Sequence, residues 1–234
     1  MRLTVYSHQE QGLRDEQEDR VLWLPEAGLF CVLDGLGGHE DGARAAQTAA
    51  DVLRAGAGVT PGLDALRALF AAAHEQVAAL APCPVSSPGS HRLSCGCRRL
   101  PATTLTALWI AGERAFIGHV GDTRIWRVRR VTNGTAEQLT KDHHDGWFLL
   151  RSIGGKTEDE PDLSEIEVRP GDTFVLVSDG VHLTGEEIAE VLACEPMETA
   201  AQRLVARGME RYGAKLRPET DNASALVVRI EAAS

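Results

Sequence analysis

The chain has 234 residues, of which 43% are hydrophobic, and a formal net charge of −10 at pH 7. This length suits one large domain or two small ones, and because no linker is visible we expect a single catalytic domain over residues 1–234. The acidic charge argues against binding to nucleic acids or to anionic membranes, since both need clustered Lys and Arg.

The cysteines and the N-terminal residues indicate the cellular compartment of the protein. The five cysteines are an odd number, and Cys31 lies inside an apolar run, which does not suit a disulfide framework. Cys83, Cys95 and Cys97 share an irregular stretch, but a C-x-C pair is weak evidence for zinc. The start of the chain has no signal-peptide core, and no apolar run reaches transmembrane length. We therefore expect a cytoplasmic protein.

Two strands and then two helices are predicted in the first part of the chain. The strands are the apolar runs Val21–Leu24 and Leu29–Leu33, with a turn at Pro25–Gly28 between them. Small and apolar residues at helical spacing predict a helix from about Asp41 to Arg54. Consecutive helices between strands favour an α+β arrangement over strict βαβ alternation.

The second predicted helix has a clear start in the sequence. Thr60 is expected as its N-cap and Pro61 as its first residue, and an apolar stripe then runs from Leu63 to Leu80. The stretch from Pro82 to Pro101 breaks all periodicity, and we interpret it as a surface loop.

Strands dominate the remainder of the chain, and their close spacing requires antiparallel pairing because parallel crossovers are longer. The expected strands are Thr104–Ile110, Ala115–Val120, Thr123–Arg129, Phe174–Val177 and Ser224–Ile230. The expected turns are Gly112-Glu113, Asn133-Gly134 and Pro170-Gly171. The expected helices are Gly185–Ala193 and Pro196–Tyr212. These elements predict a sandwich-like core with helices on its outer faces.

Aspartates stand where several of these apolar runs break, mostly with a glycine beside them. They are Asp34, Asp122, Asp179 and Asp221. A carboxylate at the end of a buried strand is held rigidly, and several that converge would form an oxygen-rich site for Mg²⁺ or Mn²⁺. The alternative is that Asp-Gly pairs only mark turns. The repetition at strand ends favours a metal cluster.

The order of the motifs carries a family resemblance. The motifs are GLRDEQEDR at 12–20, VLDGLGGH at 32–39, TTL at 103–105, GHVGDTR at 118–124, LTKDH at 139–143, PGD at 170–172, SDG at 178–180 and DN at 221–222. In this order they resemble the metal-dependent protein serine/threonine phosphatases, the PPM or type 2C family, in their compact bacterial form. The resemblance extends from about Gly12 to Ile230.

This resemblance implies a four-layer α/β/β/α sandwich, with two antiparallel sheets flanked by helices and two Mg²⁺ or Mn²⁺ ions at one end. By motif position, Asp34 would bridge both ions and Arg14 would hold the substrate phosphate. The expected metal ligands, some of them acting through water, are Glu18, Asp19, Asp34, the Gly35 carbonyl, Asp122, Asp179 and Asp221. The expected catalytic residues are Arg14, Glu18 and Asp34.

Two departures from the family pattern affect these expectations. Family members often have a third, weaker metal site, to which Asp122 would contribute, but its second aspartate is replaced here by Leu183. We therefore expect a third ion to bind weakly or not at all. The stretch from His143 to Ile153 is also shorter than the flap of bacterial relatives, which suggests an open cleft with Trp147 as an exposed candidate for recognition.

The expected function is hydrolysis of phosphoserine and phosphothreonine on proteins by a metal-activated water. The expected partners are phosphorylated proteins and a cognate Ser/Thr kinase, with no nucleic acid and no membrane, and the chain is expected to be a monomer. One alternative is a catalytically weak regulatory or binding module of the same fold. Another is a different two-metal hydrolase such as a nuclease, against which the absence of a basic groove counts.

Overall fold

The computed structural model describes residues 2–36, 41–81, 100–129, 135–146, 148–155, 160–194, 196–215 and 221–231. Several predictions lie outside these residues. They are the Asn133-Gly134 turn, most of the loop from Pro82 to Pro101 with its three cysteines, and the environment of Trp147.

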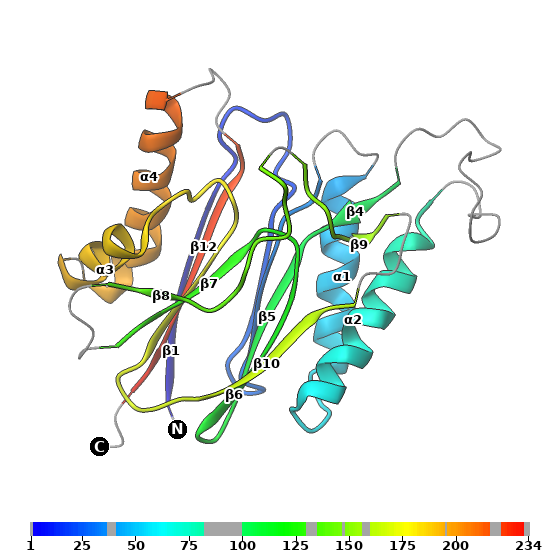
Figure 1. The fold of residues 1–234 in the computed structure, drawn as a ribbon, viewed down its shortest axis with the longest axis horizontal. Coiled ribbons are helices and arrows are strands. Elements are labelled where there is room, and N and C mark those ends of the chain that lie inside the picture. The colour runs from blue at the N-terminus through cyan, green and yellow to red at the C-terminus, as the bar shows by residue number, and fades with distance from the viewer. Residues whose placement is uncertain are drawn as a thin grey trace.

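Two five-stranded sheets form the centre of the molecule, and every strand pair in them is antiparallel (Figure 1). The first sheet has the order β1 (Leu3–Glu10), β12 (Ala223–Ile230), β11 (Thr173–Val177), β7 (Arg124–Val128) and β8 (Glu137–Gln138). The second has the order β10 (Asp162–Glu167), β6 (Arg114–Val120), β5 (Leu105–Ala111), β3 (Leu29–Leu33) and β2 (Arg20–Leu24). A short ladder pairs β4 (Ala102–Thr103) with β9 (Ile153–Gly154).

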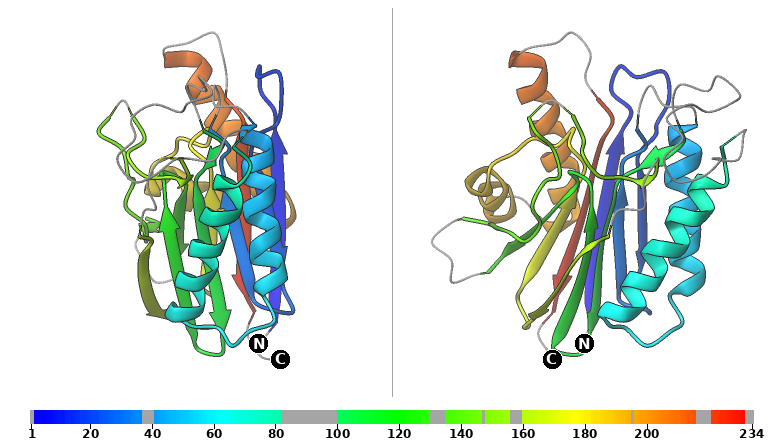
Figure 2. Two further views of the ribbon diagram at one scale, coloured as in Figure 1. Left: turned by 90° about the vertical axis from the view of Figure 1, so that its right-hand side faces the viewer. Right: turned by 45° about the vertical axis from the view of Figure 1, so that its right-hand side comes forward.

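Helices cover the outer face of each sheet, as Figures 1 and 2 show. Helices α1 (Gly42–Gly56) and α2 (Leu63–Ala78) pack on the second sheet through buried residues that include Leu53 and Phe70. Helices α3 (Gly185–Cys194) and α4 (Met197–Lys215) pack on the first sheet. A third apolar cluster lies between the sheets and contains Phe30, Phe174 and Leu226. The predicted four-layer α/β/β/α order is therefore confirmed.

The predicted turns that fall within the described residues are confirmed. At Pro170-Gly171, the Asp172 N–H donates to the Arg169 carbonyl over 3.0 Å, and Gly171 has φ of 93°, as the third residue of a type II turn requires. Gly112, with φ of 60°, joins β5 to β6 in a two-residue hairpin.

The predicted start of the second helix is wrong. Helix α2 begins at Leu63 with Gly62 at the N-cap position, and no side chain caps it. Leu63 is the first member of the apolar stripe, so packing of that stripe decides where the helix begins.

The sequence analysis also missed strands β1 and β10. Both are edge strands, and their exposed faces are polar, so neither has the continuous apolar run that marks the central strands. None of the helices in the described ranges is long and apolar enough to span a membrane.

The strand ends that carry the predicted aspartates meet at one end of the sandwich. Asp34 follows β3, and Asp19 directly precedes β2, its antiparallel neighbour. Asp179 follows β11, and Asp221 precedes β12, again an antiparallel neighbour. Because one strand ends where its antiparallel neighbour begins, each pair of aspartates shares an edge. The loop that leads from β1 to β2 lies at this end, opposite both chain termini (Figure 1).

Candidate metal centre

Asp34 follows a strand of the second sheet and Asp179 follows a strand of the first, and their carboxyl groups lie close together at the centre of the site. Burial, followed by the charges of Asp19, Asp179 and Asp122, raises the pKa of Asp34 well above its usual value. Burial, followed by the charges of Asp122 and Asp221, raises the pKa of Asp179 to about 7. These residues therefore form one electrostatically coupled acidic cluster.

The backbone of Asp34 is fixed by two buried threonines. The Asp34 N–H donates to Thr104 Oγ1 over 2.8 Å, and the Asp34 carbonyl accepts from the Thr104 N–H over 2.8 Å. Thr103 Oγ1 donates to the same carbonyl over 2.9 Å. These three hydrogen bonds fix the backbone from which the Asp34 side chain extends. The two threonines of the TTL motif therefore position this aspartate.

Gly35 allows three backbone segments to meet beside Asp34. A Cβ atom at this position would lie 2.4 Å from the Gly42 carbonyl oxygen and 2.9 Å from the Glu18 carbonyl oxygen. Gly42, the first residue of α1, is equally restricted, because its Cβ would lie 2.5 Å from Glu18 Oε1. The two glycines let the start of α1 contact the loop that carries Glu18.

Asp19 is completely buried and is held by two serine hydroxyls. Ser178 Oγ donates to Asp19 Oδ2 over 2.7 Å, and Ser224 Oγ donates to the same oxygen over 2.6 Å. Burial raises the pKa of Asp19 to about 6, although the hydrogen bonds from Ser224 and Ser178 oppose this shift. The sequence analysis assigned no role to the two serines. Their positions next to the Asp-Gly and Asp-Asn motifs were the only available signal.

Glu18 and Arg14 lie on the loop between β1 and β2, which Asn222 fastens to the start of β12. Asn222 Oδ1 accepts from the Glu18 N–H over 2.8 Å, and Asn222 Nδ2 donates to the Gln11 and Glu16 carbonyls. Glu18 is half-buried, and this burial raises the pKa of its carboxyl group although the charge of Arg14 lowers it. Asn222 therefore orients the whole loop, a role that the sequence analysis missed.

Arg14 forms an ion pair with Asp221, in which Arg14 Nη2 lies 2.6 Å from Asp221 Oδ2. This hydrogen bond is the main reason why the pKa of Arg14 is raised, and the charges of Glu18 and Asp179 add to it. The Arg14 side chain is 41% exposed, so a ligand from solvent can reach it. A predicted phosphate-binding residue thus contacts a predicted metal ligand.

The donor set of the cluster fits hard divalent cations such as Mg²⁺ and Mn²⁺. Two carboxylate oxygens, Asp19 Oδ1 and Asp179 Oδ1, are buried without a hydrogen-bond partner. Within the described residues, no three His, Cys, Asp or Glu side chains are already arranged around a common ion position. The raised pKa values of Asp34 and Asp179 mean that these carboxyl groups hold protons more tightly than usual, and ions would replace those protons. Binding therefore needs side-chain adjustment and loss of bound protons.

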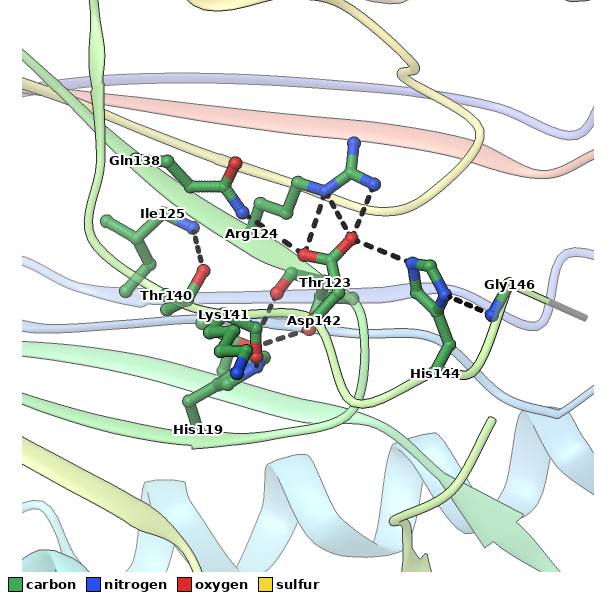
Figure 3. Close-up of polar contacts among 11 residues, drawn as sticks. His119, Thr123, Arg124, Ile125, Gln138, Thr140, Lys141, Asp142, His144 and Gly146 are labelled. Atoms are coloured by element: carbon green, nitrogen blue, oxygen red, sulfur yellow. Dashed lines mark hydrogen bonds and ion pairs between the residues drawn. The ribbon is translucent and has the colours of Figure 1, made fainter. Parts of the chain in front are cut away.

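Asp122 lies between β6 and β7 and is affected by the charge of a second carboxylate, Asp142. Both oxygens of Asp142 are engaged by protein donors (Figure 3). Arg124 Nε donates to both Asp142 oxygens at 3.0 Å, and Arg124 Nη2 donates to Oδ2 at 2.6 Å. Gln138 Nε2 and His144 Nε2 lie 3.1 and 3.2 Å from the same carboxylate. Burial, followed by the charge of Asp142, raises the pKa of Asp122.

The position expected to complete a third metal site has no oxygen ligand. Leu183 is 4% exposed and packs in the apolar cluster between α3, α4 and the first sheet. Arg124 interacts electrostatically with both Asp122 and Asp179, because the charges of both carboxylates raise the pKa of its guanidinium. A weak or absent third ion remains a prediction.

His119 holds the segment that leads into Asp142. His119 Nε2 lies 3.0 Å from the Lys141 carbonyl and His119 Nδ1 lies 2.8 Å from Thr106 Oγ1. Burial, followed by the nearby His143, lowers the pKa of His119 to about 4, so the ring is neutral at pH 7. A neutral ring donates through Nε2 and accepts through Nδ1, which satisfies both contacts.

The short segment after Asp142 forms a small turn on the surface. The Leu150 N–H donates to the His143 carbonyl over 2.8 Å, and the Asp145 N–H donates to the Phe148 carbonyl over 3.2 Å. Phe148 is 73% exposed and Leu150 is 59% exposed. Trp147, the residue expected to be an exposed candidate for recognition, directly precedes Phe148 in the chain and lies outside the described residues.

With this geometry established, comparison with known proteins identifies the family. The protein phosphatase 2C profile matches residues 6–219, most of the chain. The chain belongs to the protein phosphatase 2C family. Within it, the serine/threonine protein phosphatase PstP of Mycobacterium tuberculosis is 30% identical over 226 residues, which cover 87% of this chain. The match covers 41% of PstP, so the chain spans less than half the length of this relative.

Solved structures of the phosphatase 2C type share the whole described architecture. PppA of Pseudomonas aeruginosa, a regulatory component of T6SS, has a TM-score of 0.80 at 30% identity, with 98% of both chains covered. The catalytic domain of PstP in complex with two manganese ions has a TM-score of 0.79 at 28% identity, with 98% of this chain and 99% of that chain covered. The family and fold that the motifs predict are therefore confirmed.

Proposed function

We propose that this chain hydrolyses phosphoserine and phosphothreonine on proteins in a reaction that depends on two Mn²⁺ or Mg²⁺ ions. The observation that carries the proposal is the cluster of Asp19, Asp34, Asp179 and Asp221 at the shared end of the two sheets. The raised pKa values of Asp19, Asp34 and Asp179, and the unpartnered oxygens of Asp19 and Asp179, suit bound cations better than a merely structural role. The solved PstP catalytic domain with two manganese ions supports the same number of ions here.

The cluster offers a ligand to each ion from both sheets. We assign Asp34 as a ligand that both ions would share, the Gly35 carbonyl as a further ligand, and Asp179 and Asp221 as ligands of one ion. Asp19 and Glu18 would act at the ions directly or through water. When bound, such ions lower the pKa of a water molecule and neutralise charge on the phosphoryl oxygens.

Arg14 is assigned to the substrate phosphate. Its guanidinium is exposed, and its planar fork suits two phosphate oxygens at once. Its present partner is Asp221, so an ion that takes up Asp221 would free the guanidinium for the phosphate. Arg14 also supplies positive charge where four neighbouring carboxylates would otherwise repel a phosphate dianion.

The wider functional predictions rest on the same assignment. We infer that residues 1–234 form one catalytic domain that acts as a monomer in cytoplasmic signal transduction and opposes a Ser/Thr kinase. The short segment from His143 to Ile153 supports an open cleft, because its turn adds no further element beside the site. The two free cysteines of the described residues, Cys31 and Cys194, agree with a reducing compartment.

The proposal is tested by assaying the purified chain on a phosphothreonine peptide and on a small aryl phosphate. We expect hydrolysis with Mn²⁺, none with a chelator, and recovery when Mn²⁺ is restored. The Asp34→Ala variant should remain folded and inactive. A folded wild type that binds Mn²⁺ but hydrolyses neither substrate would refute the proposal and favour the binding-module alternative.

A further inference from the structure

A chain of neutral side chains ends on the buried carboxylate of Asp19. Gln9 Nε2 donates to Ser224 Oγ over 3.0 Å, and Ser224 Oγ donates to Asp19 Oδ2 over 2.6 Å. Ser178 Oγ donates to the same oxygen over 2.7 Å. The contacts join three strand ends, because Ser178 follows β11, Ser224 belongs to β12 and Asp19 precedes β2.

The direction of each hydrogen bond is fixed by the second partner of each hydroxyl. Ser178 Oγ accepts from the Ser224 N–H over 2.9 Å, and Ser224 Oγ accepts from Gln9. An ionised carboxylate only accepts hydrogen bonds, so both hydroxyl hydrogens point toward Asp19. The two serines therefore hold Asp19 in one rotamer.

Both hydroxyls bind the same oxygen, which leaves the other oxygen of Asp19 without a partner. Asp19 Oδ1 is buried and accepts no hydrogen bond. An unpartnered buried carboxylate oxygen is costly, and the part of the chain that the structure describes offers it no donor. The nearby charges of Asp34, Asp179 and Asp221 place the Asp19 carboxylate beside the acidic cluster. A cation, or a water molecule bound to one, supplies the missing partner.

We propose that Ser178, Ser224 and Gln9 are positioning residues that fix Asp19 with Oδ1 available to the metal centre. This inference rests on the proposed metal-dependent function and extends it to residues that contact no substrate. Because the serines belong to one sheet and Asp19 enters the other, these contacts also couple the packing of the two sheets to metal affinity. Partners that orient a metal-binding carboxylate typically change metal affinity by about 10- to 100-fold.

The test is the Mn²⁺ dissociation constant of the full chain, measured by isothermal titration calorimetry. Ser224→Ala should weaken Mn²⁺ binding by about 10- to 100-fold. Ser224→Thr keeps the hydroxyl and should restore most of the affinity. Gln9→Ala removes the outermost contact and should cost about two- to tenfold, as one ordinary hydrogen bond does.

Thr173→Val is the matched control, because it removes a buried hydroxyl from the opposite end of β11. It should leave Mn²⁺ affinity unchanged. A folded Ser224→Ala variant with wild-type Mn²⁺ affinity overturns the positioning role. If Ser224→Ala does not fold, the Gln9→Ala variant provides the test, because Gln9 is exposed. Wild-type Mn²⁺ affinity in Gln9→Ala overturns the proposal.

Calorimetry separates this inference from the proposed function. Weaker Mn²⁺ binding by Ser224→Ala supports the positioning role even if the wild type hydrolyses no phosphopeptide. Full phosphatase activity together with unchanged Mn²⁺ affinity in the variants supports the function and refutes the positioning role. A wild type that binds no Mn²⁺ refutes both.

Discussion

Asp19 and Asp142 are carboxylates on the same side of the molecule, and their partners differ in kind. Asp142 is bound by the Arg124 guanidinium, by Gln138 and by His144. These contacts, those of Arg124 above all, lower its pKa although burial would raise it. Among the described residues, the Asp19 carboxylate accepts hydrogen bonds only from neutral hydroxyls, both on one oxygen, and burial raises its pKa to about 6.

This difference shows that acidic residues in family motifs are not equivalent. A carboxylate whose oxygens are all engaged by protein donors stabilises the fold and has no free position for an ion. A buried carboxylate with an unpartnered oxygen is stable as an anion only when a cation is added. Asp19 and Asp179 belong to the second kind, and Asp142 belongs to the first.

The largest expected effect is that of removing the charge of Asp34. Asp34→Asn should lower Mn²⁺-dependent hydrolysis by at least about two orders of magnitude, because the ions that activate water lose their bridging ligand. Without metal, the variant should be as stable as the wild type or more so, since a repelled buried charge is removed. Activity assays and thermal melts in a chelator check both statements. A variant that is inactive only because it is unfolded would contradict this account.

Removing Arg14 should have the next largest effect. Arg14→Ala should lower kcat/KM by about 10- to 100-fold, the loss expected for a hydrogen bond to a charged group. Most of the change should appear in KM, because the guanidinium binds phosphate in the ground state and the transition state alike. Steady-state kinetics on a phosphopeptide provide the measurement. An unchanged KM would argue against a phosphate-binding role.

Asp142→Asn should have the opposite profile to Asp34→Asn. Loss of the charged pair with Arg124 should lower Tm by about 3–12 °C, with or without Mn²⁺. Mn²⁺ affinity should stay at the wild-type value, because Asp142 offers no free oxygen. Thermal melts and calorimetry on the same preparation test the comparison. A large loss of Mn²⁺ affinity would show that Asp142 belongs to the metal centre.

A smaller effect should appear in the pH dependence of stability. Asp19 and Asp179 have folded pKa values of about 6 and about 7, above the usual value of an aspartate. Between pH 4 and 7 the folded protein therefore keeps protons that the unfolded chain releases, so metal-free stability falls as pH rises. Mn²⁺ replaces these protons, so its stabilising effect should grow over the same range. Melts from pH 5 to 8, with and without Mn²⁺, should show Tm curves that diverge. Parallel curves would mean that no proton is displaced.

Much of the fold was predictable because apolar runs and turn residues act locally. The buried strands β3 and β11 and the turn at Pro170-Gly171 follow directly from the sequence. Strand β1 was not predictable in the same way. It pairs with β12, more than 200 residues away, and its polar outer face hides its periodicity.

The residues of the candidate site likewise divide into those that were predictable from the sequence and those that were not. Asp34, Asp122, Asp179 and Asp221 were found because each one borders an apolar run, and Asp19 was found through the family motif. The structure brings them to one end of the sandwich. The partners of these aspartates were missed, because Ser178, Ser224 and Asn222 are ordinary polar residues until distant strands meet. Arg124 was likewise indistinguishable from a surface charge until the fold placed it against Asp142.

The most direct test is manganese anomalous scattering from a crystal of the wild-type chain soaked in Mn²⁺. The account predicts two strong peaks beside Asp34, with Asp179 and Asp221 turned toward one of them and Arg14 released from Asp221. Crystals that diffract well and show Arg14 still paired with Asp221, with no anomalous peak beside Asp34, would contradict it.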